Sequence, residues 1–289
     1  METTATLLVS CSDRSGVIAA VTRAVADAGG NVLDADQHAD PETGRFSMRL
    51  AFEGSFETSF DAAGSRAVFE AAMEGLAGDL SLDWRVRWPG KRRRCVVLCS
   101  RQTHCVADLM WRVSIGELPM ELTRVISNHV EAEALARSFG FAYTVLPVTP
   151  ETKAAQEQRV ADALAADDVE LVVLARYMQV LSPALVSRYP GRIINIHHSF
   201  LPAFAGARPY HQAFERGVKL IGASAHYVTD ELDEGPIIAQ QTMDVSHRDT
   251  VSDMVRKGRD LERVVLAEAV RLHLEDRVIV DGRRTVVFG

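Results

Sequence analysis

The chain has 289 residues, of which 47% are hydrophobic and 25% charged, and 32 Lys and Arg against 39 Asp and Glu give a net charge of −7. This composition is typical of a soluble protein of about two domains, and the negative balance disfavours nucleic-acid or acidic membrane partners. The 4 Cys have no CxxC spacing, and no apolar run approaches the ~20 residues of a membrane span, so we predict a cytoplasmic protein without a disulfide framework or a zinc site.

The first ninety residues carry the pattern of a small α/β domain. Period-two alternation, helical spacing and turn signals predict the order βαββαβ, over residues 5–12, 17–28, 31–39, 46–52, 62–76 and 82–88. Gly29 and Gly30 follow the first helix, as glycine commonly does at a helix end. This order is that of the ferredoxin-like split-βαβ fold. Pro89-Gly90 marks the boundary between a domain at 1–90 and a second domain at 91–289.

The second domain alternates continuous apolar strands with helical stretches, which is typical of a mostly parallel, Rossmann-like sheet covered on both faces. We predict strands at residues 95–99, 122–126, 143–148, 171–174 and 193–196, and two more at an antiparallel end, at 218–228 and 236–245. A helix at 151–166, a long amphipathic helix at 250–274 that Gly258 interrupts, and a hairpin around Asp281-Gly282 complete the chain.

Two polar segments follow buried strands in this second domain. Residues 195–202 read NIHHSFLP, and residues 226–236 read HYVTDELDEGP, with four carboxylates within five positions. In an open parallel sheet, ligands bind in the crevice at the strand ends. A lone His or Asp there is more often a cap or a surface group, but two such segments favour a reactive site.

These segments resemble the motifs N-I-H-x-S-x-L-P and H-x-V-T-D-E-L-D-x-G-P of the formyltransferase-fold family that uses 10-formyltetrahydrofolate. Residues 174–182, LARYMQVLS, are similar to the folate-binding segment of that family. Four stretches resemble one branch of it, the formyltetrahydrofolate deformylases: residues 100–105, 116–118, 125–129 and 146–150. Residues 1–90 are similar to the ACT domain of that branch, so the resemblance covers essentially the whole chain.

The resemblance implies hydrolysis of the formamide on N10 through a tetrahedral oxyanion. Asn195 and His197 correspond to the oxyanion-stabilising pair, and their spacing lets both side chains lie on one side of a strand. Asp233 corresponds to the carboxylate that holds the attacking water as general base, and we expect burial to raise its pKa toward the working range. His198 and His226 are candidates for supporting roles. The resemblance implies no metal, and no cofactor beyond the folate substrate.

The resemblance also implies a pterin pocket. Its two walls would be formed by Met178, Gln179, Val180 and Leu181 on one side, and by the backbone of Thr229, Asp230 and Glu231 on the other. For Met178, Val180 and Leu181 the alternative is a purely structural position in the core.

Formyl transfer to an amine acceptor is the nearest alternative to hydrolysis. A transferase that acts on a phosphorylated acceptor needs a glycine-rich loop, because backbone amides must approach the phosphate closely. Residues 100–105, after the first strand of the second domain, contain no glycine, so we favour water as the acceptor. The resemblance then implies that the enzyme supplies formate for purine synthesis and balances the one-carbon folate pool. A non-catalytic sensor is a second alternative, which the intact Asn195, His197 and Asp233 disfavour.

The turn before the first helix predicts a regulatory site. Asp13, Arg14 and Gly16 lie at a helix start, where free amides favour a carboxylate, and Asn31 is where ACT domains commonly place a ligand-binding amide. The resemblance implies a glycine or methionine effector at a subunit interface, and therefore a homo-oligomer of at least two subunits. The alternative is an ACT domain that serves only in dimerisation.

Overall fold

The structure is a computed structural model that describes residues 4–54, 60–203 and 209–289. The chain divides into two compact units, and its C-terminal segment contributes to both. The first unit comprises Met1–Lys91, Glu275–Asp281 and Val286–Gly289, and the second comprises Arg92–Leu274 and Gly282–Thr285. Within the described ranges, no helix has the length and apolar character needed to cross a membrane.

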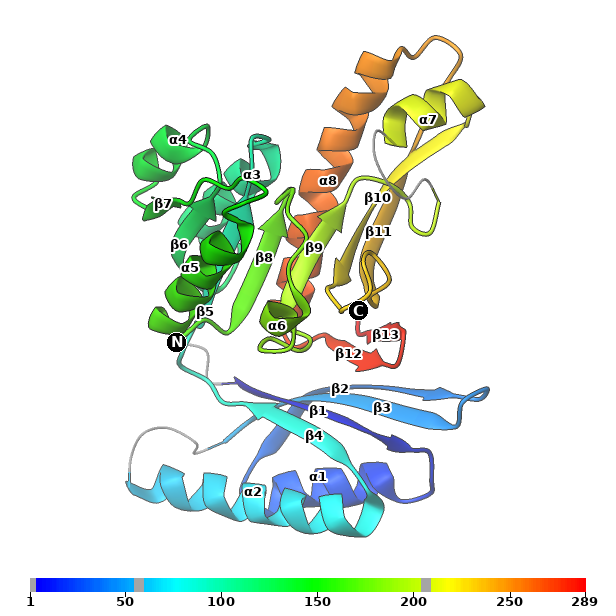
Figure 1. Ribbon diagram of the computed structural model, residues 1–289. Helices are drawn as coiled ribbons and strands as arrows, with labels where there is room; N and C mark the ends of the chain where they lie inside the picture. The colour runs from blue at the N-terminus through cyan, green and yellow to red at the C-terminus, as the bar shows by residue number, and fades with distance from the viewer. Residues whose placement is uncertain (1–3, 55–59, 204–208) are drawn as a thin grey trace. The chain divides into compact units, whose positions relative to one another are not determined.

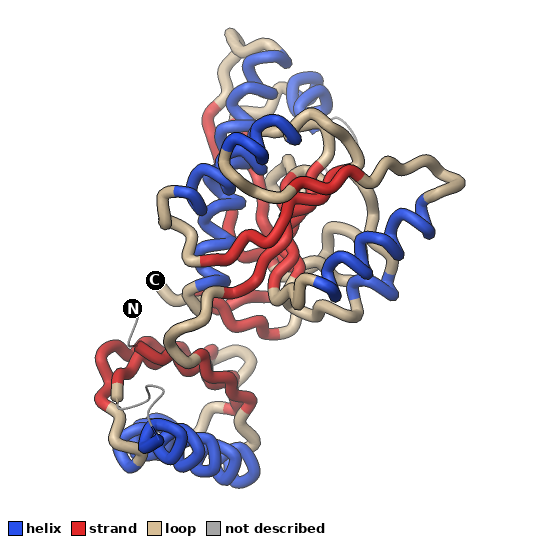
Figure 2. The backbone as a smooth tube through the Cα atoms, turned by 90° about the vertical axis from the view of Figure 1, so that its left-hand side faces the viewer, coloured by secondary structure: helices blue, strands red, loops and turns tan. Residues whose placement is uncertain are grey.

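The N-terminal unit contains a four-stranded antiparallel sheet in the order β2-β3-β1-β4. Its elements are β1 (Thr4–Ser12), α1 (Val17–Asp27), β2 (Asn31–Asp40), β3 (Arg45–Glu53), α2 (Phe60–Leu80) and β4 (Asp83–Arg87), which confirms the predicted βαββαβ order. The two helices form a layer against one face of the sheet (Figures 1 and 2). Alternate residues of β1 and β3, such as Leu7 and Leu50, fill the core between the layers.

Residues from the end of the chain complete this first unit. The predicted C-terminal hairpin is present as β12 (Val278–Asp281) and β13 (Arg284–Val287). Ile279 and Phe288 pack with Leu8 of β1 in a second apolar cluster. The buried Arg49 of β3 donates from Nε to the backbone oxygen of Asp276, 3.1 Å away. The C-terminal segment therefore stabilises the sheet that begins the chain.

The second unit contains a seven-stranded sheet in the order β11-β10-β9-β8-β5-β6-β7. The strands are β5 (Arg93–Cys99), β6 (Met120–Ser127), β7 (Tyr143–Val145), β8 (Leu171–Ala175), β9 (Ile193–His197), β10 (Leu220–Tyr227) and β11 (Ile237–Asp244). β5 to β9 pair in parallel, whereas β10 is antiparallel to β9 and to β11, which confirms the predicted arrangement. The chain order reverses between β5 and β8, and this is the switch point at which open α/β sheets bind ligands.

Helices cover both faces of this sheet. They are α3 (His104–Ser114), α4 (Glu133–Ser138), α5 (Lys153–Ala166), α6 (Pro183–Val186), α7 (Pro209–Arg216) and α8 (Val251–Leu274). α5 packs Val160 and Leu164 against Leu98 and Leu174 of the sheet. The long α8 contacts β9, β10, β11 and α3, and it runs along the sheet in Figure 1. Layers on both sides explain why the parallel strands read as continuous apolar runs.

Gly258 does not interrupt the last long helix, so that prediction is wrong. α8 is continuous from Val251 to Leu274, and Gly258 lies buried within it. A Cβ built at Gly258 would lie 2.0 Å from Tyr210 Oη of α7. The glycine therefore allows α7 and α8 to pack closely, and it does not break α8.

Candidate active site

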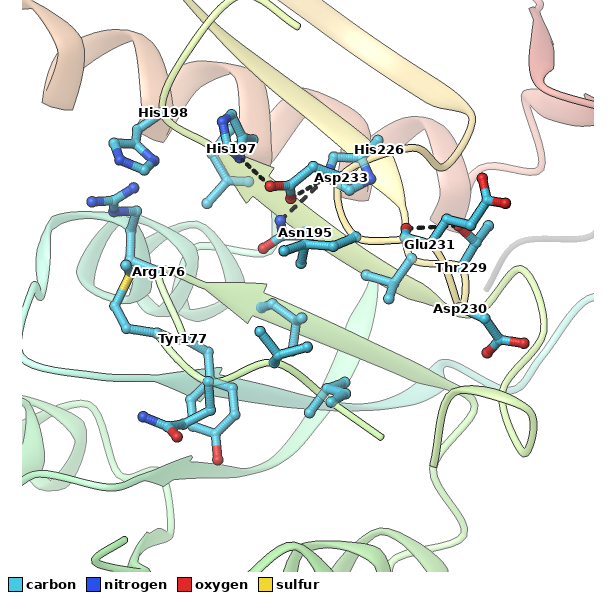
Figure 3. A pocket seen from close by; sticks show the side chains of 18 residues that line it. Arg176, Tyr177, Asn195, His197, His198, His226, Thr229, Asp230, Glu231 and Asp233 are labelled. Carbon is cyan, nitrogen blue, oxygen red and sulfur yellow. Dashed lines mark hydrogen bonds and ion pairs between the residues drawn. The ribbon is translucent and has the colours of Figure 1, made fainter. Parts of the chain in front are cut away.

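A pocket of about 430 Å3 lies where β8, β9 and β10 meet the segments that follow them (Figure 3). The pocket brings together every residue that the sequence assigned to catalysis, folate binding or catalytic support: Asn195, His197, Asp233, Met178, Gln179, Val180, Leu181, Thr229, Asp230, Glu231, His198 and His226. Segments that are far apart in the sequence therefore share one cavity.

Asn195 is held by a neighbouring strand. Asn195 and His197 both belong to β9, two residues apart, so their side chains leave the strand on the same side. His226 of β10 is the cross-strand partner of Asn195, and Asn195 Nδ2 lies 3.2 Å from His226 Nε2. His226 Nδ1 donates to the backbone oxygen of Tyr227 (2.9 Å), so in the neutral ring Nε2 accepts from the amide. His226 thus fixes the Asn195 amide and leaves its second N–H for a ligand.

Asp233 reaches the same point from the segment after β10. Its Oδ2 lies 3.2 Å from His197 Nδ1, and its Oδ1 lies 3.7 Å from His226 Nε2 (dashed lines in Figure 3). The Asp233 backbone is left-handed, with φ of 58°. Two residues later, a Cβ at Gly235 would lie 1.7 Å from the Tyr227 carbonyl oxygen. Only glycine fits this close approach, which turns the segment back over β9.

The two imidazoles reverse the expectation for the Asp233 carboxyl group. We expected burial to raise its pKa, and this is wrong. The hydrogen bond from His197, and then the adjacent His226 imidazole, hold the pKa of the Asp233 carboxyl well below its usual range and outweigh desolvation. Asp233 is therefore ionised at neutral pH. It can accept hydrogen bonds from water and stabilise positive charge on His197, but its own proton affinity is low.

His197 presents an unpaired nitrogen to the pocket. The ring is 5% exposed, and its Nε2 is buried without a hydrogen-bond partner among the described residues. Buried polar atoms of this kind are normally paired, so Nε2 is placed to meet a ligand or a water molecule. The ring of His198 lies next to it, 5.1 Å away between centroids. Burial, followed by the charge of Arg176, lowers the pKa of His198 to about 4, so this ring is neutral at pH 7.

The segment after β8 forms an apolar wall of the pocket. Met178 and Val180 are 59% and 54% exposed, which excludes the core alternative for these two residues. Leu181 packs on the apolar core beneath the pocket. On the other side, Thr229 Oγ1 donates to the backbone oxygen of Glu231 (3.1 Å) and orders the turn. Exposed apolar side chains beside ordered backbone are suited to a flat heterocyclic ligand.

The sequence analysis assigned no role to three residues around the pocket, Ser100, Arg176 and Glu262, although the first two lie in segments that resemble the family. Ser100 accepts from the Met178 amide (3.0 Å) and donates to Asn128 Oδ1 (2.7 Å), so it ties together the segments after β5, β6 and β8. Arg176 lines the pocket, and its Nε lies 3.4 Å from Glu262 Oε2 of α8. The sequence did offer a signal for two of them. Arg176 ends an apolar run, and Glu262 is a carboxylate on the apolar face of the last long helix.

The residues predicted to bind an effector do not meet within one chain. Asp13, Arg14 and Gly16 form the exposed turn before α1, and the Asp13 amide donates to the Gly44 oxygen (2.7 Å) at one end of the sheet. Asn31 is the first residue of β2, and it pairs with Glu53 at the opposite end. A single site that contains both groups would therefore need two copies of the chain.

Comparisons with known proteins cover both units. The Formyl transferase family matches residues 93–270, and the ACT domain family matches residues 5–59. A formyltetrahydrofolate deformylase of Synechocystis sp. is 48% identical over 285 residues, 99% of this chain and 98% of that relative. The crystal structure of a formyltetrahydrofolate deformylase from Pseudomonas syringae pv. tomato has a TM-score of 0.93 at 44% identity, over 99% of this chain and 94% of that chain.

A transformylase matches less of the chain. Glycinamide ribonucleotide transformylase 1 from Symbiobacterium toebii has a TM-score of 0.66 at 34% identity, and the match covers 70% of this chain and 97% of that one. The two deformylases, in contrast, match both units together. The chain therefore belongs to the formyltetrahydrofolate deformylase family, in which an ACT domain precedes a formyl transferase domain.

Proposed function

We propose that the pocket hydrolyses 10-formyltetrahydrofolate to formate and tetrahydrofolate. The observation that carries this proposal is the meeting of Asn195, His197 and Asp233 at one place, from β9 and from the segment after β10. A carboxamide, an imidazole and an ionised carboxylate can together polarise a formamide and hold a water molecule. The apolar wall at Met178 and Val180 supports a pterin ring beside them. No metal or cofactor is required by this chemistry.

The proposed mechanism follows from the free atoms of the site. The second N–H of Asn195 and a proton on His197 Nε2 stabilise the oxygen of the formyl group as it becomes an oxyanion, and each such donor contributes about 10²–10³ in rate. Asp233 binds and orients the attacking water, and the proton that the water loses as its oxygen adds to the formyl carbon is not kept on this weakly basic carboxylate. The proton then passes to N10 as the C–N bond breaks, and the formic acid released ionises to formate.

Water is favoured over an amine as acceptor. The segment between β5 and α3, residues 100–103, contains no glycine, and side chains in such a segment would obstruct the close backbone approach that a phosphate needs. The Asn195, His197 and Asp233 side chains themselves would serve either reaction. The distinction therefore depends on the acceptor site and on the family relationship.

One assay separates the three candidate activities. The purified full-length chain, given 10-formyltetrahydrofolate and no amine, should release formate and tetrahydrofolate in equal amounts. Formation of tetrahydrofolate only when an amine is added would support transfer instead. Binding of the folate without any turnover would support a sensor.

We infer that the ACT unit binds an amino acid, glycine or methionine by family resemblance, and that it does so between two copies of the chain. The inference is supported by the opposite placement of the Asp13–Gly16 turn and Asn31, since only a second copy could bring them together. The edge strand β2 is exposed along nearly its whole length, and unpaired edge strands favour pairing with another chain. Such control would limit the loss of activated one-carbon units while formate is supplied to purine synthesis.

A further inference from the structure

Arg176 occupies a backbone position that favours glycine. It directly follows β8, and its φ of 61° lies in the left-handed region, where a residue with a Cβ is strained. The side chain is nevertheless 7% exposed, lines the pocket, and reaches toward His198 (Figure 3). Strained residues persist where the surrounding structure holds them, and they cluster at functional sites.

The guanidinium group of Arg176 has one ion-pair partner among the described residues, Glu262, and that contact is through Nε. Its Nε lies 3.4 Å from Glu262 Oε2 but makes no hydrogen bond of good geometry, and the side chain has no other partner within the described residues. A guanidinium carries five N–H donors, and its two terminal groups form a fork that matches a carboxylate. A buried arginine whose fork has no protein partner is prepared to receive an anion.

Glu262 holds Arg176 in place without occupying the fork. Tyr210 donates to Glu262 Oε1 (2.8 Å), and His104 Nε2 lies 2.8 Å from Oε2. Burial alone would raise the pKa of the Glu262 carboxyl, but the His104 hydrogen bond and the Arg176 charge lower it below its usual value, so Glu262 is ionised. His104, Cys105 and Glu262 place ligand atoms within 4.8 Å of one another, but the Arg176 guanidinium already supplies the positive charge that a metal ion would bring.

We propose that Arg176, beside His198, forms an anion subsite that receives the formate product; this rests on the proposed hydrolysis. Formate is generated next to the ionised Asp233, and two carboxylates at close range repel each other. The free guanidinium fork lies in the same pocket, on the far side of the His197 ring from Asp233 (Figure 3). A monovalent carboxylate can therefore move from a repulsive site to an attractive one before it leaves.

The test measures formate inhibition of the full-length enzyme. The initial rate of tetrahydrofolate formation is recorded over a series of sodium formate concentrations, with sodium chloride holding the ionic strength constant. We expect formate to inhibit the parent, and Arg176→Gln to weaken that inhibition about 10- to 100-fold, as expected for the loss of a charge-assisted bidentate contact. Arg176→Lys keeps the charge without the fork, and should lie between the two. Arg188→Gln, which alters an exposed arginine after α6, should match the parent.

A second variant, and a measurement that does not depend on turnover, distinguish loss of the formate subsite from misfolding. Arg176→Gln leaves Glu262 buried without its cation, whereas the double variant Arg176→Gln/Glu262→Gln removes both charges, and it should show the same loss of formate inhibition. The rise in thermal unfolding midpoint that formate causes in the parent should disappear in both variants, independently of turnover. Equal formate inhibition and equal stabilisation in parent and variants would overturn the subsite. An unchanged response to formate with a raised KM for the folate would instead place a folate carboxylate on Arg176, and a parent that releases no formate would reject the proposed hydrolysis itself.

Discussion

Asp233 lies against two imidazoles, and these contacts decide what its carboxylate can do. Because its pKa is held low, the group stays ionised beside His197, and in the proposed mechanism it also holds the attacking water. We expect Asp233→Asn to lower kcat for formate release by about 10²–10⁴, since a neutral amide neither holds the attacking water as a charged acceptor nor balances charge on His197. KM for 10-formyltetrahydrofolate should remain nearly unchanged, because the apolar wall is untouched. Initial-rate measurements of formate release give both values.

Glu234 offers a matched control for this variant. It is the next residue, its side chain is exposed and pairs with Arg283, and it lies outside the pocket. Glu234→Gln removes the same charge from the same segment and should retain the parental kcat. If the two variants hydrolysed the folate at equal rates, Asp233 would not be the carboxylate that handles the water.

His198 makes the stability of the protein depend on pH in a defined window. Its pKa is lowered to about 4 in the folded protein, chiefly by burial. The pKa of this histidine in the unfolded chain is about 6.5. Between pH 6.5 and pH 4, the unfolded chain is therefore protonated at His198 and the folded protein is not, so the free energy of unfolding falls as the pH falls. From pH 7 to pH 5 the loss is about 1–2 kcal/mol, at most about 1.4 kcal/mol per pH unit.

Replacing His198 should remove that loss. We expect His198→Gln to show a smaller decrease in the free energy of unfolding between pH 7 and pH 5 than the parent, measured by urea denaturation. His247→Gln, which replaces an exposed histidine, is the matched control. A parental slope in His198→Gln would mean that the ring is protonated in the folded protein near its ordinary pKa.

At the scale of elements, local patterns were sufficient to predict strands and helices in both units. Continuous apolar runs marked β5, β8 and β9, because burial on both faces leaves a direct trace in the sequence. Period-two alternation located β3, but the implied half-burial is wrong, since Ser47 and Arg49 on its second face are buried as well. The error at Gly258 has a different origin. Glycine is unfavourable in a helix by local propensity, but its reason here is the Tyr210 ring on another helix, which no local pattern reveals.

Two effects of opposite sign compete at Gly258. Alanine in a helix interior is favoured over glycine by about 1 kcal/mol. Overpacking of a close contact costs about 1–3 kcal/mol, and Tyr210 cannot move freely because its hydroxyl donates to Glu262. We therefore expect Gly258→Ala to lower the free energy of unfolding, measured by urea denaturation. In Gly75→Ala on α2 the new methyl group meets no neighbour, so that variant should be slightly stabilised, and equal stability of the two would contradict the packing role.

The edge strand β2 leads to a prediction about assembly. Leu33 is 51% exposed on this strand, whose residues take no part in the apolar core of the unit. If β2 pairs with a second copy, Leu33→Lys introduces repelling charges at the interface and should shift the protein toward monomer. Light scattering after gel filtration measures this shift. Val68→Lys, at an exposed apolar position of α2, is the control and should leave the mass unchanged.

At the scale of the whole molecule, the sequence predicted which residues are candidates for catalysis but not what surrounds them. Asn195, His197 and Asp233 could be found because each belongs to a motif of adjacent residues. The low pKa of Asp233 could not, because it depends on imidazoles from two strands that meet only in the folded sheet. Arg176 and Glu262 are 86 positions apart in the chain, and their contact is visible only in three dimensions.

The separated halves of the predicted effector site give a prediction for the assembled protein. In a symmetric dimer, the turn of one copy would face Asn31 of the other, and two equivalent sites would form. Arg14→Ala and Asn31→Ala should each abolish the response of formate release to glycine or methionine while the basal rate is retained. Glu74→Gln, an exposed change on α2, should respond like the parent.

Mixing the two unresponsive variants then tests where the site lies. In a mixed dimer, one site carries both substitutions, whereas the other combines an intact turn with an intact Asn31, so unfolding and refolding the variants together should restore part of the response. Restoration requires that each site draws on two chains, because neither variant can supply both groups alone. A mixture that stays unresponsive, while refolded parent responds, would place the complete site within a single chain. A parent that responds to none of the amino acids would leave the ACT unit with a role in assembly alone.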